Sequence, residues 1–185
     1  MTTLRFTKYF LCIIAAALTW TSCVDDDDSL SAQMTLTVNG AEYRLSGAQY
    51  RPGDDLGNGI YEGRVYFNTA GVAIGPNGEI GGGGAVLEML VTSGDSMVLT
   101  GGTYELAAPM PVSSVGQFAA VDSRVLIGDD IADNPVAILI SGGRMEVEAH
   151  SGNSYNVEFI GTGFEFGAST TTPVDVALIY EGAVQ

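Results

Sequence analysis

The sequence predicts an all-β domain, a single antiparallel β-sandwich or flattened barrel of about seven to ten strands. Short segments with alternating apolar and polar residues recur along the chain, as in half-buried strands. Turn residues separate these segments, and the chain contains 25 glycines. No stretch after residue 22 shows a sustained 3.6-residue apolar period, so we expect no α-helix longer than two turns there.

The first expected hairpin joins residues 34–38 to residues 41–45 through Asn39-Gly40. This dipeptide suits both positive-φ positions of a type I′ turn. Residues 47–59 are rich in Gly, Pro, Asp and Asn, which predicts a loop. The next strand is expected at residues 60–68.

A glycine-rich stretch at residues 75–84 predicts a hairpin loop. A phosphate-binding loop would precede a helix and usually contain a lysine. Here the strand-like segment 85–91 follows, and no lysine occurs after the leader. Further strands are expected at 101–106 and at 118–127, the latter with an irregularity at Asp122-Ser123.

The C-terminal third gives the clearest strand pattern. The continuous apolar run 136–140 predicts a strand buried on both faces. Residues 144–150 and 155–159 alternate and predict a hairpin with a charged outer face, and residues 174–180 close the sheet. The residues expected in the core are Leu36, Val38, Leu87, Met89, Ile138, Ile140, Val147, Val157, Phe159 and Leu178.

The first 22 residues have the parts of a bacterial export signal: a basic start, an apolar run at 10–18 and small residues at 21–22, just before Cys23. The apolar run is shorter than the ~20 residues that cross a bilayer. An uncleaved anchor and cleavage without acylation remain alternatives. The expected division is a signal peptide at 1–22, an acylated cysteine with an acidic tether at 23–32, and one β domain at 33–185.

This leader resembles the lipoprotein signal peptides of the Bacteroidetes, although Trp20 stands where leucine is usual. The run Asp25, Asp26, Asp27, Asp28 resembles their signal for export to the outer face of the outer membrane. The resemblance implies lipid attachment at Cys23, an outer-membrane location and an outward-facing domain. A solvated spacer is the alternative interpretation of the aspartates.

The mature domain has no cysteine left for a disulfide, because Cys12 leaves with the leader and Cys23 takes the lipid. One hydrophobic core is expected to hold the fold. Its layout, with Gly101–Leu106 and a late hairpin at 142–159, resembles the small β-domain lipoproteins of gut Bacteroidetes.

The charge balance excludes nucleic acid as a partner. The chain has 7 basic and 22 acidic residues. Removing the leader takes away Arg5 and Lys8 and no acid, so the net charge falls from −15 to −17. Such a surface repels phosphate backbones.

The chain contains few candidate catalytic residues, and we expect no enzymatic activity. His150 is the single histidine, and no G-x-S-x-G motif occurs. Carboxylates are grouped at Asp54/Asp55, at Glu146/Glu148 and at Asp129/Asp130/Asp133. Glu146 and Glu148, two residues apart on one strand face, would lie roughly 7 Å apart, a spacing that glycoside hydrolysis tolerates. Any strongly acidic chain contains such pairs.

Two binding hypotheses follow from the loops. Asp129, Asp130, Asp133 and Asn134 place hard oxygen ligands in one segment, which would suit calcium. A solvated turn is the alternative, and no other cofactor is expected. Tyr50 beside Arg51, together with Tyr61, would suit a glycan-binding face.

The expected function is that of a non-enzymatic surface lipoprotein, a binding or assembly module on the outer membrane. Its partners would be the membrane, through the lipid, and a protein or glycan ligand. A small glycan-acting hydrolase and a pilus or adhesin subunit are the alternatives. Neither composition nor motifs identify the ligand.

Overall fold

Strands make up nearly all the regular structure of this chain. The computed structural model describes residues 34–107, 114–120, 122–168 and 172–185, which contain twelve strands and no helix. The prediction of an all-β fold is confirmed. Ten strands form one sheet and two form a small second sheet. The strands are β1 (Thr35–Val38), β2 (Ala41–Gly57), β3 (Ile60–Thr69), β4 (Val72–Ile74), β5 (Ile80–Gly82), β6 (Gly84–Ser93), β7 (Gly102–Ala107), β8 (Gln117–Ala119), β9 (Arg124–Gly128), β10 (Val136–Ala149), β11 (Ser154–Glu165) and β12 (Pro173–Ala183).

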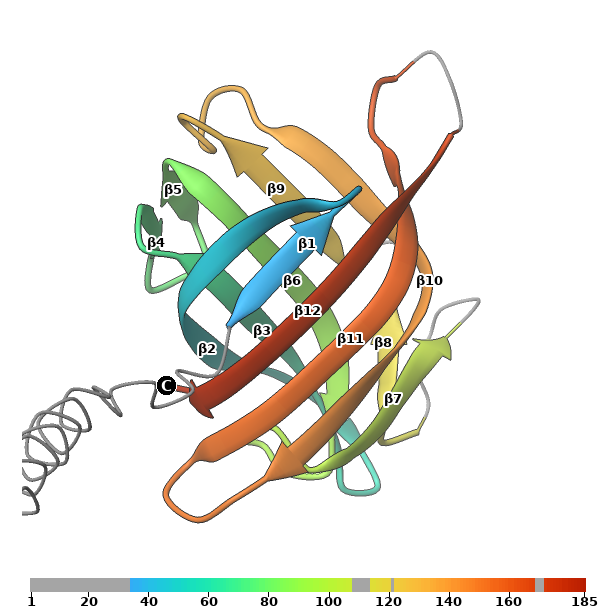
Figure 1. Ribbon diagram of the computed structural model, residues 1–185. Coiled ribbons are helices and arrows are strands. Elements are labelled where there is room, and N and C mark those ends of the chain that lie inside the picture. Colours follow the sequence, from blue (N-terminus) through green and yellow to red (C-terminus); the bar gives the residue numbers. More distant parts are fainter. Residues whose placement is uncertain (1–33, 108–113, 121, 169–171) are drawn as a thin grey trace, which may run out of the picture. The chain divides into compact units, whose positions relative to one another are not determined.

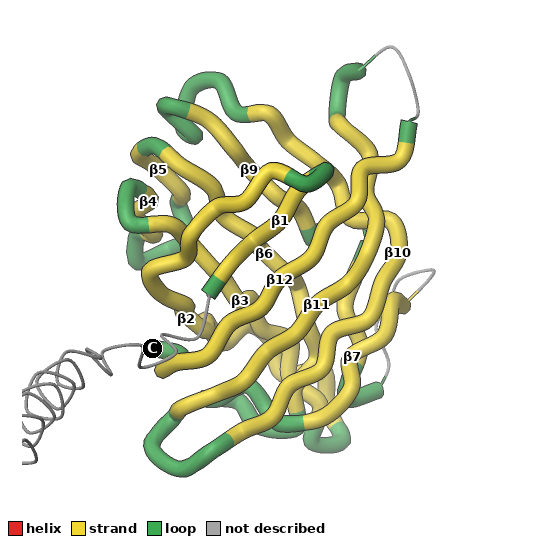
Figure 2. The backbone as a smooth tube through the Cα atoms, viewed as in Figure 1, coloured by secondary structure: helices red, strands yellow, loops and turns green. Residues whose placement is uncertain are grey.

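The large sheet closes on itself. Hydrogen bonding runs β1–β2–β3–β6–β9–β10–β11–β12 and from β12 back to β1, so these eight strands form a ring (Figures 1 and 2). The flattened barrel is therefore the better of the two predicted architectures. Strand β9 connects β6 and β10 along one part of their length, and β8 and β7 connect them along another part. Strands β8 and β7 run parallel to each other in an otherwise antiparallel sheet.

The first hairpin has the predicted turn. Asn39 and Gly40 have φ values of 47° and 79°, as a type I′ turn requires. Leu36 pairs with Tyr43 across the two strands. Asn39 also donates its N–H to the Asp175 carbonyl and accepts the Asp175 N–H, so this turn is fastened to β12.

The loop predicted at 47–59 is wrong, because β2 continues through it to Gly57. The irregular residues are absorbed by three register shifts, one of them between Pro52 and Asp55. Pro52 lacks an N–H, but β2 pairs only with β3 beyond Tyr50, whose N–H is donated to the Gln185 carbonyl. The true turn is Asn58-Gly59, with φ values of 57° and 74°.

The interior of the ring holds the main hydrophobic core, and all ten predicted core residues lie in it. Two pairs of aromatic side chains pack across this core: the ring centroids of Phe67 and Tyr180 are 5.3 Å apart, and those of Phe118 and Phe159 are 5.9 Å apart. Each buried side chain of this size stabilises the fold by roughly 1.5–3 kcal/mol. The described residues from Met34 onward belong to one compact unit.

The strand buried on both faces is β6 rather than the predicted segment 136–140. In that segment the outward-facing Ala137 and Leu139 are only partly buried, and Val136, which shares the inward parity of Ile138 and Ile140, is 46% exposed at the start of β10. By contrast, β6 has Leu87 inside the ring and Val86 outside, where the β4–β5 hairpin packs over it with Ile74 and Ile80. The glycine-rich stretch at 75–84 therefore belongs to a hairpin, as predicted.

The strand predicted at 118–127 is two strands, β8 and β9, which are separated at the predicted irregularity. Ser123 lies in the break and is buried. Its hydroxyl accepts the N–H of Leu90 at 3.2 Å and its carbonyl accepts the N–H of Ile140 at 2.9 Å. The irregularity is thus tied to both neighbouring strands.

No helix in the residues described is long and apolar enough to span a membrane.

Candidate functional site

A row of side chains crosses the outer wall of the ring at one level. Tyr66 of β3, Glu88 of β6, Arg124 of β9 and Leu139 of β10 are register partners in consecutive strands. All four point outward, since the residues that alternate with them belong to the interior core. Phe164 of β11 pairs with Leu139 and extends the row with a partly exposed ring.

This row borders a cleft of about 300 Å³, which Arg64, Asn77, Gly78 and Asp122 also line. A second hollow of about 260 Å³ shares Arg64, Asn77 and Gly78 and continues towards residues 51–53. The two hollows therefore form one groove along the outer face of β3. The turn between β4 and β5 supplies one wall, and the break between β8 and β9 supplies Asp122.

Glu88 is the electrostatic centre of the cleft. Its side chain is only 4% exposed, and both carboxylate oxygens form ion pairs with arginines. Oε1 lies 2.8 Å from Nη1 of Arg64, and Oε2 lies 2.8 Å from Nε of Arg124. A carboxylate buried among strands needs such partners, because desolvating an unpaired charge is very costly.

The two arginines keep much of their hydrogen-bonding capacity free. Their side chains are 37% and 45% exposed, so they border both Glu88 and solvent. Arg64 donates to Glu88 only through Nη1, and Arg124 donates to it only through Nε. Among the described residues, Nε and Nη2 of Arg64 and both terminal nitrogens of Arg124 have no partner. These N–H groups are available to a ligand in the cleft.

Arg51 fixes the loop that forms the cleft wall. Its Nη1 donates to the Pro76 carbonyl at 3.0 Å, and its Nη2 donates to the Ile74 carbonyl at 3.4 Å and to Oε1 of Gln49 at 3.3 Å. Two of these contacts join the β4–β5 hairpin to β2, and the third holds the guanidinium against β2 itself. The Nε atom of Arg51 is buried without a partner.

Within that turn, Glu79 accepts the side-chain amide of Asn77 at 2.8 Å and its backbone N–H at 3.1 Å. The Asn77 side-chain bond is the main reason why the pKa of Glu79 lies below its usual value. Gly78 has φ +86°, and a Cβ there would lie 2.9 Å from the Tyr66 hydroxyl. Glycine therefore lets the turn lie close against Tyr66.

Tyr66 is buried beneath this turn. Burial raises the pKa of its hydroxyl, and the negative charge of Glu88 adds to the rise, while Arg64 and Arg51 oppose it. The hydroxyl is therefore neutral at physiological pH. It provides a polar group at the cleft without adding charge.

Glu88 could have been found in the sequence, because it is the one charged residue in the apolar segment 85–91. A charge in a strand that is otherwise apolar indicates a buried partner. Which arginines meet it depends on the strand order, and no local pattern specifies that order.

No protein-family model matches this chain, and no curated protein or solved structure matches it.

The predicted lipid and calcium sites have different outcomes. Cys23 and Asp25 to Asp28 lie outside the described residues, so these predictions stand as made. In the described parts of the chain, no three His, Cys, Asp or Glu side chains are grouped to hold a metal ion. The loop of Asp129, Asp130, Asp133 and Asn134 therefore does not gather its carboxylates. Asp130 instead accepts the N–H of Ala132 at 3.1 Å, as in a polar turn.

The aromatic face suggested for glycans is not formed. Tyr50 is in the interior core, because β2 continues through the expected loop and turns this side chain inward. Arg51 points the other way and holds the β4–β5 turn. Tyr61 is half-buried at the start of β3.

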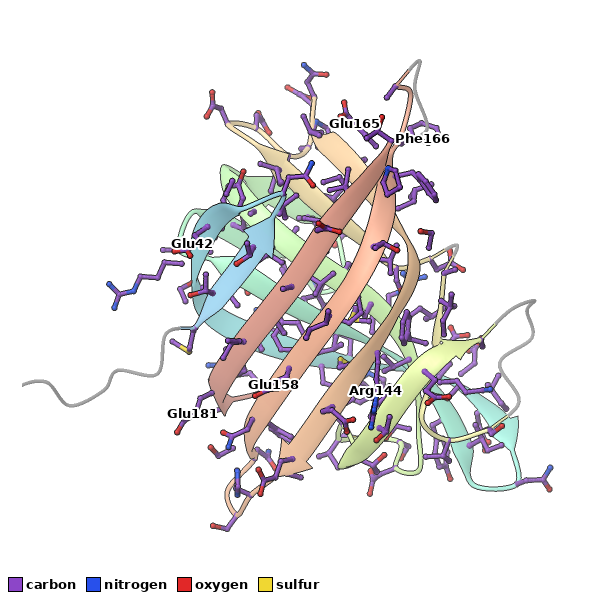
Figure 3. The ribbon with its side chains drawn as sticks, turned by 45° about the vertical axis from the view of Figure 1, so that its right-hand side comes forward. Glu42, Arg144, Glu158, Glu165, Phe166 and Glu181 are labelled. Carbon is purple, nitrogen blue, oxygen red and sulfur yellow. The ribbon has the colours of Figure 1, made fainter. Side chains whose placement is uncertain are left out.

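The predicted carboxylate pairs do not face the cleft. Glu146 accepts the Thr103 hydroxyl at 2.8 Å and pairs with Arg144, while Glu148 lies 3.9 Å from His150. Figure 3 shows Arg144 on the wall that also carries Glu158 and Glu181. Arg144 lies five residues beyond Leu139 on β10, or roughly 17 Å along the strand.

Proposed function

We propose that this chain is a non-enzymatic binding module, held by a lipid on Cys23 at the outer face of the outer membrane. The observation that carries the binding role is the cleft over Glu88. Its guanidinium donors are held in place before any ligand arrives, and such preorganisation lowers the cost of binding. Small-molecule sites are typically preformed concavities with a few convergent polar groups, which this cleft resembles.

Binding fits the cleft better than glycan hydrolysis does. A glycosidase needs one carboxyl group free to give a proton and a second to act as nucleophile or base. Both oxygens of Glu88 are already engaged by arginines, so this carboxylate is not free to act on a glycosidic bond. Asp122 is the only other carboxylate lining the cleft among the described residues.

The pilus alternative needs an exchangeable strand at an open sheet edge. Here β1, the first strand described, is paired on both sides, with β2 and with β12. The closed ring therefore supports a self-contained module in preference to a subunit completed by a partner's strand.

The location is tested by fractionation of cells. Changing Cys23→Ala should release the protein from membranes, since it removes the acylated side chain. Replacing Asp25 to Asp28 with alanine should leave the protein attached but lower its cleavage by external protease. Full membrane retention of the Cys23 variant would contradict lipid anchoring, and unchanged cleavage of the aspartate variant would reduce the run to a spacer.

The binding role is tested with the full chain in non-ionic detergent and a panel of neutral and charged sugars, amino acids and inorganic anions. We expect at least one class to bind with a Kd below about 1 mM, the weak end of specific binding. Arg124→Gln should weaken that binding. Arg144→Gln is the matched control, because it also removes an arginine from a pair with a glutamate. A panel without binders, or binders indifferent to the cleft substitution, would refute the proposal.

A further inference from the structure

We infer that the cleft over Glu88 recognises the carboxylate of a small ligand, held by Arg64 and Arg124. This inference rests on the proposed binding function and names the chemistry of its ligand. It follows from the free donors, from the charge around them and from the position of Asp122.

The free donors match a planar anion. Arg124 bonds Glu88 through Nε alone, which leaves Nη1 and Nη2 as a two-pronged donor. Arginine forks of this kind bind carboxylates and phosphates through two parallel hydrogen bonds. Glu88 shows that one carboxylate can lie between these two guanidinium groups, and a ligand carboxylate would use their remaining nitrogens.

The charge balance favours a singly charged group over a doubly charged one. The mature domain carries −17, with only five basic residues. Three of these five, Arg51, Arg64 and Arg124, lie along the groove. In the cleft itself, Arg64 and Arg124 are balanced by Glu88 and Asp122. A phosphate dianion would meet more repulsion from this domain than a carboxylate would.

Asp122 gives the ligand a second requirement. Its carboxylate lines the same cleft, and no hydrogen bond or ion pair from the described residues engages it. It would repel a bare anion but accept a hydrogen bond from a hydroxyl or ammonium group. The ligand should therefore carry a donor near its carboxylate, as sugar acids and α-amino acids do.

The size of the cleft agrees with a small ligand. About 300 Å³ is at the lower end of the range for small-molecule sites. Leu139 lines the cleft and pairs with Phe164, so an apolar border lies on the β10–β11 side. A sugar ring or a short side chain could rest there.

Matched probes test the inference by calorimetric titration of the full chain in detergent. The pairs are glucuronate with glucose and alanine with alaninamide, because each pair differs in the carboxylate. Inorganic phosphate is the dianion probe. We expect at least one acid to bind at least tenfold more tightly than its neutral partner, and phosphate to bind more weakly than that acid. Preference for glucuronate would identify a sugar acid, and preference for alanine would identify an amino acid.

Variants assign the effect to the cleft. Arg124→Gln should weaken binding of the preferred acid about tenfold or more, the loss of roughly one charge-assisted hydrogen-bonded contact. Arg124→Lys keeps a cation beside Glu88 and protects the fold, but lysine lacks the fork, so binding should still fall severalfold. Asp122→Asn should weaken binding of the ammonium compound more than that of the sugar acid. Arg144→Gln should change nothing.

Equal affinity for an acid and its neutral partner would overturn the carboxylate inference and leave a binding module for neutral ligands. Phosphate binding more tightly than both acids would also overturn it. If no probe or panel compound binds, the proposed function fails as well. Unchanged affinity in both Arg124 variants would place the carboxylate elsewhere on the protein.

Discussion

Removing both arginines from Glu88 is the most informative test of the buried cluster. The single variants Arg64→Gln and Arg124→Gln each lose one contact of 2.8 Å. A hydrogen bond to a charged group contributes roughly 1.5–3 kcal/mol. Both arginines are more than one-third exposed, so we expect the lower figure for each single variant. The double variant leaves a carboxylate that is 4% exposed with no cation, and should lose about 3–5 kcal/mol.

A third substitution separates this cause from general damage. Adding Glu88→Gln to the double variant removes the buried charge and should restore about 2 kcal/mol, because a neutral amide costs less to bury. Urea unfolding at pH 7 measures the free energy of unfolding of the wild type and of the two single, the double and the triple variants. Arg144→Gln is the control and should cost under about 0.5 kcal/mol, since its pair is exposed. A double variant that loses less than 1 kcal/mol, or a triple variant no more stable than the double, would refute the reasoning.

Three further predictions concern the core, high pH and calcium. Val157→Asp should cost about 3 kcal/mol or more in the free energy of unfolding, since it puts an unpaired charge at a fully buried position; a loss under 0.5 kcal/mol would mean that this position faces outward. Burial raises the pKa of Tyr104 from 10.0 to about 12, so its contribution to stability is complete below pH 10 and lost between pH 10 and 12, roughly 2–3 kcal/mol in total. Alkaline unfolding of Tyr104→Phe should lack that portion, and an identical pH dependence would contradict the shift. Millimolar calcium should raise the Tm no more than sodium at the same ionic strength, and a calcium-specific rise abolished by Asp130→Asn with Asp133→Asn would revive a metal site.

The sequence was sufficient for the fold class and the inward faces of the strands. Alternation at 144–150 and 155–159 identified Val147, Val157 and Phe159 as core because a strand turns every second side chain to the same face. The Asn39-Gly40 turn was predictable because few other dipeptides accept two positive φ values.

The errors have one physical origin, which is that pairing partners decide what a strand tolerates. Residues 47–59 contain the composition of a loop, yet Pro52 is accommodated where β2 has a neighbour on one side only. Likewise, the β4–β5 hairpin packs on the outer face of β6, where Val86 is fully buried, while Ala137 and Leu139 on the outer face of β10 are only partly buried. Neither neighbour can be read from the local sequence.

The cleft was missed for the same reason. Its charged residues come from segments far apart in the chain: Arg64 is 24 residues from Glu88, and Arg124 is 36 residues away. Only the ring order β3–β6–β9 brings them together. The lone charge at Glu88 indicated a partner, but strand order decides which arginines serve.

Arginine side-chain NMR gives the most direct test of the central claim that Arg64 and Arg124 hold the carboxylate of a ligand. Residues 34–185 contain five arginines, so their Nε–Hε signals can be assigned by single substitutions. Titration with whichever acid binds best should shift the signals of Arg64 and Arg124 along a common saturation curve, while the signal of Arg144 stays in place. Saturable binding that leaves both cleft signals unmoved, or moves Arg144 equally, would contradict the claim.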